Sequence, residues 1–221
     1  MNSWMLTPLL LKIMVIQNNH KKRIVHNLMS SDMETRGIQM TEEDILTQAA
    51  QCITQGNFMG AMEIFESYIA ANSNDPSGYH GWAEAAMFEI QENGNMDDKG
   101  NDRINEGKIA AYLKKAAGLD SDNAEYLASY ANALIEFDRV PMAIREFQKL
   151  RVLGEKSDEV DVSFHLYEAA RMLIDSINLK TNFDRSEQFA RQYTPIAIEF
   201  AILGLGFTSI EEAMEYIATE E

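Results

Sequence analysis

Apolar and small residues recur every three or four positions along most of this chain, which is the spacing of amphipathic helices. The clearest example lies in residues 124–153, where two such stripes follow one another. The stripes consist of Leu127, Tyr130, Ala131 and Leu134, then Val140, Ala143, Phe147 and Leu150. A helix pair of this kind cannot bury its apolar face alone, so the pattern predicts a pair that stacks on neighbouring pairs.

The same periodicity divides most of the chain into similar units. The predicted helix pairs cover residues 42–75, 79–121, 124–153 and 163–193, and capping helices cover 195–219. Thr41 is the expected N-cap of the first helix, and Pro76 is placed to open a later one. Residues 92–107 are polar and lack periodicity, so we expect a long surface loop inside the second unit. We therefore interpret residues 41–221 as one helical repeat domain.

The C-terminal third contains less regular signals. Residues 154–158 are expected to separate the third and fourth units. The second stripe of the fourth unit is expected to contain Phe183, Phe189 and Tyr193. Thr194 and Pro195 resemble a helix start, and Thr208 to Glu211 fit a capping box. Residues 196–205 could form a buried strand, but a single strand has no partner, so a helix ended by Gly204 and Gly206 is preferred.

Residues 1–40 are interpreted as an N-terminal extension. Residues 4–16 are mostly apolar, but Pro8 and Lys12 interrupt a run that is already shorter than the roughly 20 residues of a membrane-spanning helix. The basic residues follow the apolar run, whereas a secretory signal carries them before it. The extension is either an extra helix on the first repeat or a stretch ahead of a native start at Met29, Met33 or Met40; a weak membrane anchor is the remaining alternative.

The net charge of −16 is unevenly distributed. Residues 1–41 contain five basic and two acidic residues, so the remainder carries a net charge of −19. Such an acidic body disfavours nucleic acid and would attract basic partners, although solubility alone is an equally simple explanation. Cys52 is the single cysteine, which excludes an internal disulfide and fits a reducing, cytoplasmic location.

These helix pairs resemble tetratricopeptide repeats. Small residues stand where paired helices cross closely, and aromatic residues fill the space between repeats. The matching positions are Ala49, Ala61 and Phe65 in the first unit, Trp82 and Ala86 in the second, and Leu127, Ala131, Ala143 and Phe147 in the third. The resemblance implies an all-α, right-handed α-solenoid of antiparallel helix pairs with a C-terminal capping helix. It also implies a concave groove that binds a peptide or helix of a partner protein.

Helical spacing assigns an apolar strip with acidic edges to this groove. The expected groove residues are Glu43, Leu46, Ala50, Ile53, His80, Ala83, Met87, Ile90, Glu125, Ala128, Asn132, Ile135, Tyr167 and Arg171. Such a strip suits a basic or amphipathic peptide, although part of it could instead pack against the chain's own N-terminal segment.

The resemblance also leads to a prediction about one common ligand of the family. Family members that clamp a chaperone's C-terminal carboxylate use Lys, Asn and Arg, and the matching positions here are Leu46, Ala50, Glu84, Glu125 and Ser129. With two carboxylates and no cation at these positions, we predict that an acidic chaperone tail does not bind.

No catalytic motif accompanies the repeats, so we expect no catalytic residues, no cofactor and no metal. The four histidines lack metal-site spacing. Asn95, Asp97, Gly100 and Glu106 hold four positions of a calcium-loop pattern, but Lys99 occupies a ligand position and argues against calcium. The expected function is a non-enzymatic protein-interaction module. The alternatives are a secretion-type or assembly chaperone for an aggregation-prone substrate and, remotely, an enzyme with its site around His165, Tyr167 and Arg171.

Overall fold

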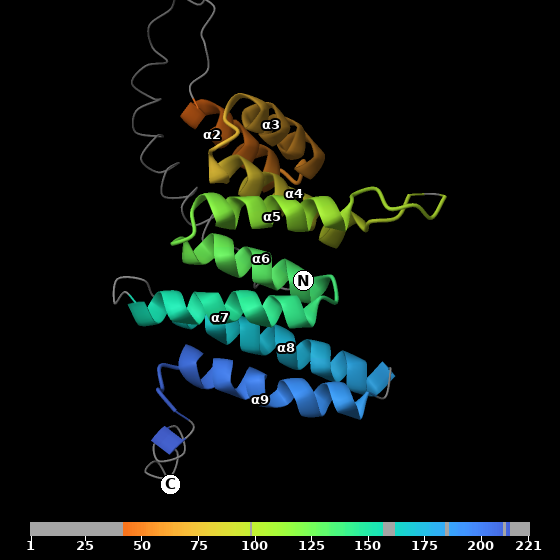
Figure 1. Cartoon of the computed structure of the whole chain (residues 1–221). Helices are drawn as coiled ribbons and strands as arrows, with labels where there is room; N and C mark the ends of the chain where they lie inside the picture. The colour runs from red at the N-terminus through yellow and green to blue at the C-terminus, as the bar shows by residue number, and fades with distance from the viewer. Residues whose placement is uncertain (1–41, 98, 157–161, 184–185, 210, 213–221) are drawn as a thin grey trace, which may run out of the picture.

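The computed structural model describes residues 42–97, 99–156, 162–183, 186–209 and 211–212. Eight α-helices lie within these ranges: α2 (Glu42–Thr54), α3 (Phe58–Ala71), α4 (Pro76–Asn93), α5 (Glu106–Leu119), α6 (Ala124–Glu136), α7 (Val140–Lys156), α8 (Ser163–Phe183) and α9 (Glu187–Gly204). Figure 1 shows them stacked in chain order, from α2 at one end to α9 at the other. The predicted all-α class is confirmed for this part of the chain, where an isolated β-bridge between Met96 and Asp102 is the only strand-like pairing.

Consecutive helices pack against each other along the whole stack, and α6 also contacts α8. A single hydrophobic cluster runs from Ala49 in α2 to Phe200 in α9. Phe147 in α7 is fully buried, and its ring lies 5.7 Å from that of Phe200, centre to centre. The apolar stripes of successive helices therefore share one core, as expected for helices that cannot bury their faces alone.

Asx side chains begin several of these helices. Asn57 accepts a hydrogen bond from Gly60 N, Asp75 from Ser77 N, and Asn123 from the backbone of the first turn of α6. Pro76 then occupies the first turn of α4, where a missing N–H costs nothing. The starts at residues 76 and 124 confirm the predicted ones, because capping depends on local sequence alone.

A glycine permits the closest helix crossing near the N-terminal end of the stack. Gly81 in α4 faces the ring of Phe65 in α3, and a Cβ atom added at Gly81 would lie 2.2 Å from that ring. A side chain at Gly81 would displace the Phe65 ring, so this packing favours glycine at the position.

The loop between α4 and α5 is shorter than predicted, since the helices extend to Asn93 and begin again at Glu106. The Asp97 carboxylate accepts hydrogen bonds from the backbone N–H of Lys99 and Asn101, both at 2.8 Å. These bonds, led by the one from Asn101, hold the pKa of Asp97 below its ordinary value. Arg103 forms a 2.5 Å ion pair with the buried carboxylate of Glu89 and ties the loop to α4.

The predicted break at residue 154 is wrong, because α7 continues to Lys156. A Cβ atom added at Gly154 would lie 2.4 Å from the Val162 side chain. Gly154 therefore does not end α7. It allows α7 to lie close to the segment that precedes α8.

Two predictions in the C-terminal third are also wrong. Phe183 is the last residue of α8, not part of the following helix, and Pro195 lies inside α9 instead of at a helix start. Pro195 removes the N–H that would bond the carbonyl of Arg191, but both residues are exposed, so water can reach that carbonyl. Ser186 caps α9 instead, by accepting from Phe189 N. The predicted end at Gly204 is confirmed.

The capping box after α9 is displaced by one residue. Ser209 Oγ accepts from Glu212 N at 3.1 Å, and the Glu212 carboxylate accepts from Thr208 N at 2.7 Å. The pattern therefore uses Ser209 and Glu212 rather than Thr208 and Glu211. The predictions for Thr41, for residues 1–40 and for the helix after residue 212 concern residues outside the described ranges.

Candidate functional site: a groove over α4, α6 and α8

A groove of about 180 Å³ runs over one helix from each of three consecutive pairs. Most of its lining residues come from α4, α6 and α8, and Leu113 comes from α5. They are Glu84, Met87, Phe88, Gln91, Leu113, Glu125, Ala128, Ser129, Asn132, Ala133, Glu136, Phe164, His165, Glu168, Arg171 and Met172. The groove thus combines apolar surface with several carboxylates.

His80 joins α4 to α6 beneath this groove. The side chain is almost fully buried, and its Nε2 atom lies 3.0 Å from Ser129 Oγ. Its ring also packs on Tyr126, with 4.8 Å between ring centres. Ala83 on α4 and Ala128 on α6 are buried as well. The register between α4 and α6 is therefore held by a polar contact as well as by packing.

Glu84 places a buried carboxylate in the lining of the groove. Its Oε2 atom lies 3.7 Å from His80 Nδ1 and has no hydrogen-bond partner, although the atom is buried. Desolvation raises the pKa of this carboxyl, and nearby Glu125 raises it further, while His80 opposes both. Asn132 Oδ1, on α6, is likewise buried without a hydrogen-bond partner. Buried acceptors without donors are rare in folded proteins.

The α8 wall carries the cation of the groove. Arg171 bonds Glu168 at 2.7 Å and lies 3.7 Å from Asp175, so its charge is shared with two neighbours on its own helix. At the end of α6, desolvation raises the pKa of Glu136 to about 7. Much of Glu136 is nevertheless exposed, and the water at that surface limits how far its pKa can rise.

Five of the expected groove residues line this groove together: Met87, Glu125, Ala128, Asn132 and Arg171. Others on the same helices do not line the groove and are buried, namely His80, Ala83 and Ile135. Glu43, Leu46, Ala50 and Ile53 belong to α2, away from these lining residues, and Ala50 and Ile53 are buried. Ile90 and Tyr167 do not line it, and Tyr167 is exposed.

Helical spacing did not assign several lining residues to the groove. They are Phe88, Gln91, Leu113, Ala133, Glu136, Phe164, Glu168 and Met172. The sequence analysis named Glu84 and Ser129 only as positions that match a carboxylate clamp. It named His165 only as part of the alternative enzyme site. The contact between α6 and α8 brings in the α8 residues, and no local pattern signals where that contact falls.

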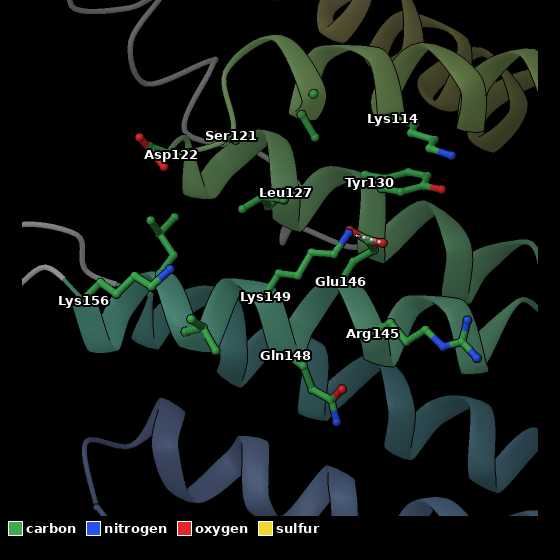
Figure 2. Close-up of a pocket in the computed structure, with 14 residues that line it drawn as sticks. Lys114, Ser121, Asp122, Leu127, Tyr130, Arg145, Glu146, Gln148, Lys149 and Lys156 are labelled. Carbon is green, nitrogen blue, oxygen red and sulfur yellow. Dashed lines mark hydrogen bonds and ion pairs between the residues drawn. The ribbon is translucent and has the colours of Figure 1, made fainter.

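A second depression lies on another side of the stack, between α5 and α7, and its volume is about 680 Å³. Figure 2 shows Lys114 coming from α5 and Lys149 and Lys156 from α7, on opposite sides of Leu127 and Tyr130. We call this feature the outer pocket. Lys149 bonds Glu146 at 2.7 Å. The basic side chains of the outer pocket are exposed, so water and salt screen their charges.

The described residues show neither a metal centre nor a membrane-spanning helix. No three His, Cys, Asp or Glu side chains among them gather closely enough to hold a metal ion. None of the described helices combines the length and the apolar character needed to cross a membrane. In comparisons with known proteins, no family model matches the chain and no curated protein matches it significantly.

Proposed function

We propose that this chain is a non-enzymatic, cytoplasmic binding protein whose α4–α6–α8 groove holds a peptide or helix of a partner protein. The proposal includes a right-handed, tetratricopeptide-like solenoid of antiparallel helix pairs. Its main support is that alternate helices of the stack, α4, α6 and α8, line one groove. In stacked helix pairs, alternate helices lie on the same side, where they form an extended binding surface.

Charge supports a basic or amphipathic partner. Helices α2, α4 and α6 contain acidic residues but no Lys or Arg. Glu84, Glu125 and Glu136 line the groove beside apolar residues such as Met87 and Phe88. A peptide with apolar and cationic side chains would complement this surface, whereas an acidic chaperone tail would be repelled.

A chaperone for an aggregation-prone substrate is the second candidate. Large apolar side chains are exposed along α8, at Phe164, Tyr167, Ile174 and Leu179. Surface of this kind suits extended apolar segments of an unfolded chain. Co-purification of an unfolded substrate would favour this candidate, and a folded, stoichiometric partner would count against it.

The test is peptide display against the full chain, followed by calorimetric measurement of the selected peptides. Phe164 lines the groove and is 58% exposed, so Phe164→Ala should weaken binding about tenfold without unfolding the protein. Met142 on α7 is 45% exposed and lies outside the groove, which makes Met142→Ala the matched control. Equal binding to both variants would place the peptide elsewhere and contradict the proposal.

A further inference from the structure

Two buried acceptor atoms in the groove lack donors. Glu84 on α4 and Asn132 on α6 both line this groove. Their atoms Glu84 Oε2 and Asn132 Oδ1 are buried and have no hydrogen-bond partner. The Glu84 side chain is only 11% exposed. Folded proteins satisfy such atoms with water, an ion or a ligand, so this pair marks a place where a donor is missing.

The groups around Glu84 leave its carboxylate short of positive charge. From its own helix, His80 Nδ1 lies 3.7 Å away and is charged only when protonated. From α6, Glu125 and Glu136 add negative charge to the groove. From α8, Glu168 and Arg171 form an ion pair with each other, and His165 lines the same wall.

We propose that Glu84 and Asn132 form a subsite for one cationic side chain, Lys or Arg, of the bound peptide. This inference rests on the proposed function and specifies the partner's chemistry. Ammonium and guanidinium groups are donors only, so they can satisfy both acceptors without presenting another acceptor to them. A volume of about 180 Å³ suits one long side chain rather than a whole helix at this point. Met87 and Phe88 would pack along its aliphatic stem.

Binding at this subsite depends on pH in a definite direction. Burial raises the pKa of Glu84, so part of the free protein carries a proton there that a cation must displace. Raising the pH removes this proton and leaves the carboxylate free to pair with a cation. Glu136, whose pKa is also raised by desolvation, gains negative charge in the same direction, and Arg171 keeps its positive charge because its hydrogen bond with Glu168 raises its pKa. Affinity for a cation therefore increases as the pH rises through the pKa of Glu84.

The test uses N-acetyl-arginine amide and N-acetyl-lysine amide as probes, with N-acetyl-citrulline amide as the neutral isostere of the arginine probe. Each probe is titrated into the full, ¹⁵N-labelled chain while the side-chain amide signal of Asn132 is followed. We expect the cationic probes to shift this signal and citrulline to bind at least tenfold more weakly. Glu84→Gln should weaken the cationic probes at least tenfold, whereas Glu146→Gln in the outer pocket should not. Asn132→Ala is the second variant if Glu84→Gln fails to fold, and binding to it is followed by the backbone amide signals of α4 and α6.

Equal binding of citrulline, or unchanged binding to both groove variants, would overturn the subsite and leave water as its occupant. Peptide display separates this failure from that of the proposed function. Peptides selected by the native chain should be enriched in Lys or Arg at one position, and selection on Glu84→Gln should lose this enrichment. Selected peptides that bind the groove without such a preference would refute the subsite while leaving the proposed function intact. If no peptide binds the groove at all, the proposed function fails.

Discussion

The groove and the outer pocket lie on the same stack of helices, yet they differ in how far their charged side chains are exposed to water. In the groove, the carboxylate of Glu84 is buried and its pKa is raised, mainly by desolvation. In the outer pocket, Lys114, Arg145 and Lys149 are exposed to water. The two features share α6, whose residues Ala128 and Asn132 face the groove while Leu127 and Tyr130 face the outer pocket.

This difference separates the two kinds of electrostatic effect. An exposed cation is already solvated, so it contributes solubility and weak, salt-sensitive attraction. A buried carboxylate has lost its water, so a correctly placed donor gains much more by pairing with it. The outer pocket is larger, but the groove is the better candidate for specific recognition.

The largest expected effect is on the free energy of unfolding, and it compares a side chain of the hydrophobic core with one of the groove wall. Phe147 is fully buried between α7 and α9, and Phe147→Ala should lower the free energy of unfolding by about 3–5 kcal/mol. Phe164→Ala, at an exposed groove position, should change it by no more than about 0.5 kcal/mol. Urea denaturation followed by circular dichroism measures both. Similar losses in the two variants would mean that the groove wall is part of the core.

The next effect concerns the start of α4, which carries one wall of the groove. Asp75 caps this helix, and Asp75→Ala should cost about 1 kcal/mol at neutral pH. Burial acts to raise the pKa of Asp75, but hydrogen bonds from Tyr68 and Ser77 outweigh it and lower the pKa. The stabilisation is therefore present at neutral pH and is lost as the pH falls through the lowered pKa.

Denaturation at neutral and acid pH measures this cap directly. Asp122→Ala is the matched control, because Asn123 and not Asp122 caps α6. A penalty for Asp75→Ala that persists unchanged at pH 2 would show that its charge does not stabilise α4.

A smaller effect is a change of pH dependence at Glu84. Its folded-state pKa is raised, so folding holds this proton more tightly than the unfolded chain does. Stability from this group is fully present below the unfolded pKa and is lost as the pH rises through the folded pKa. Glu84→Gln should therefore flatten the decline of Tm with rising pH. Glu146→Gln, which removes the partner of Lys149, is measured in parallel as the matched control. If Tm depends on pH in the same way in Glu84→Gln as in the native protein, the native Glu84 carboxyl is exposed to water.

The smallest effect is expected in the outer pocket. Replacing Lys114 and Arg145 together by Gln should change the free energy of unfolding by no more than about 0.5 kcal/mol. Denaturation in low and high salt provides the measurement. A loss above 1 kcal/mol that disappears in salt would show that these cations hold α5 and α7 in place.

The sequence predicted most helices because their signals are local. The period of apolar residues located α2 through α7, and side chains such as Asn57, Asp75 and Asn123 mark where helices begin. Local signals failed at two positions in the C-terminal third of the chain. Gly154 is required by Val162, and Pro195 is tolerated inside α9 where both it and Arg191 face water.

The site could be predicted only in part. Spacing on one helix places Glu125, Ala128 and Asn132 on a common face, and the structure brings them together in the groove. Spacing cannot tell whether a residue on that face is covered by the next helix, and Ile53, Ala83 and Ile135 are buried.

By itself, the sequence determined the all-α class, most helix boundaries and the concentration of negative charge, since each follows from residue type and short-range periodicity. Only the tertiary structure decided which charges are buried. Glu84 and Glu146 are both helical glutamates, but Glu84 lies without a hydrogen-bond donor at Oε2 while Glu146 is held by Lys149. Desolvation depends on how far helices from different units approach each other, and that distance is a property of the assembled stack.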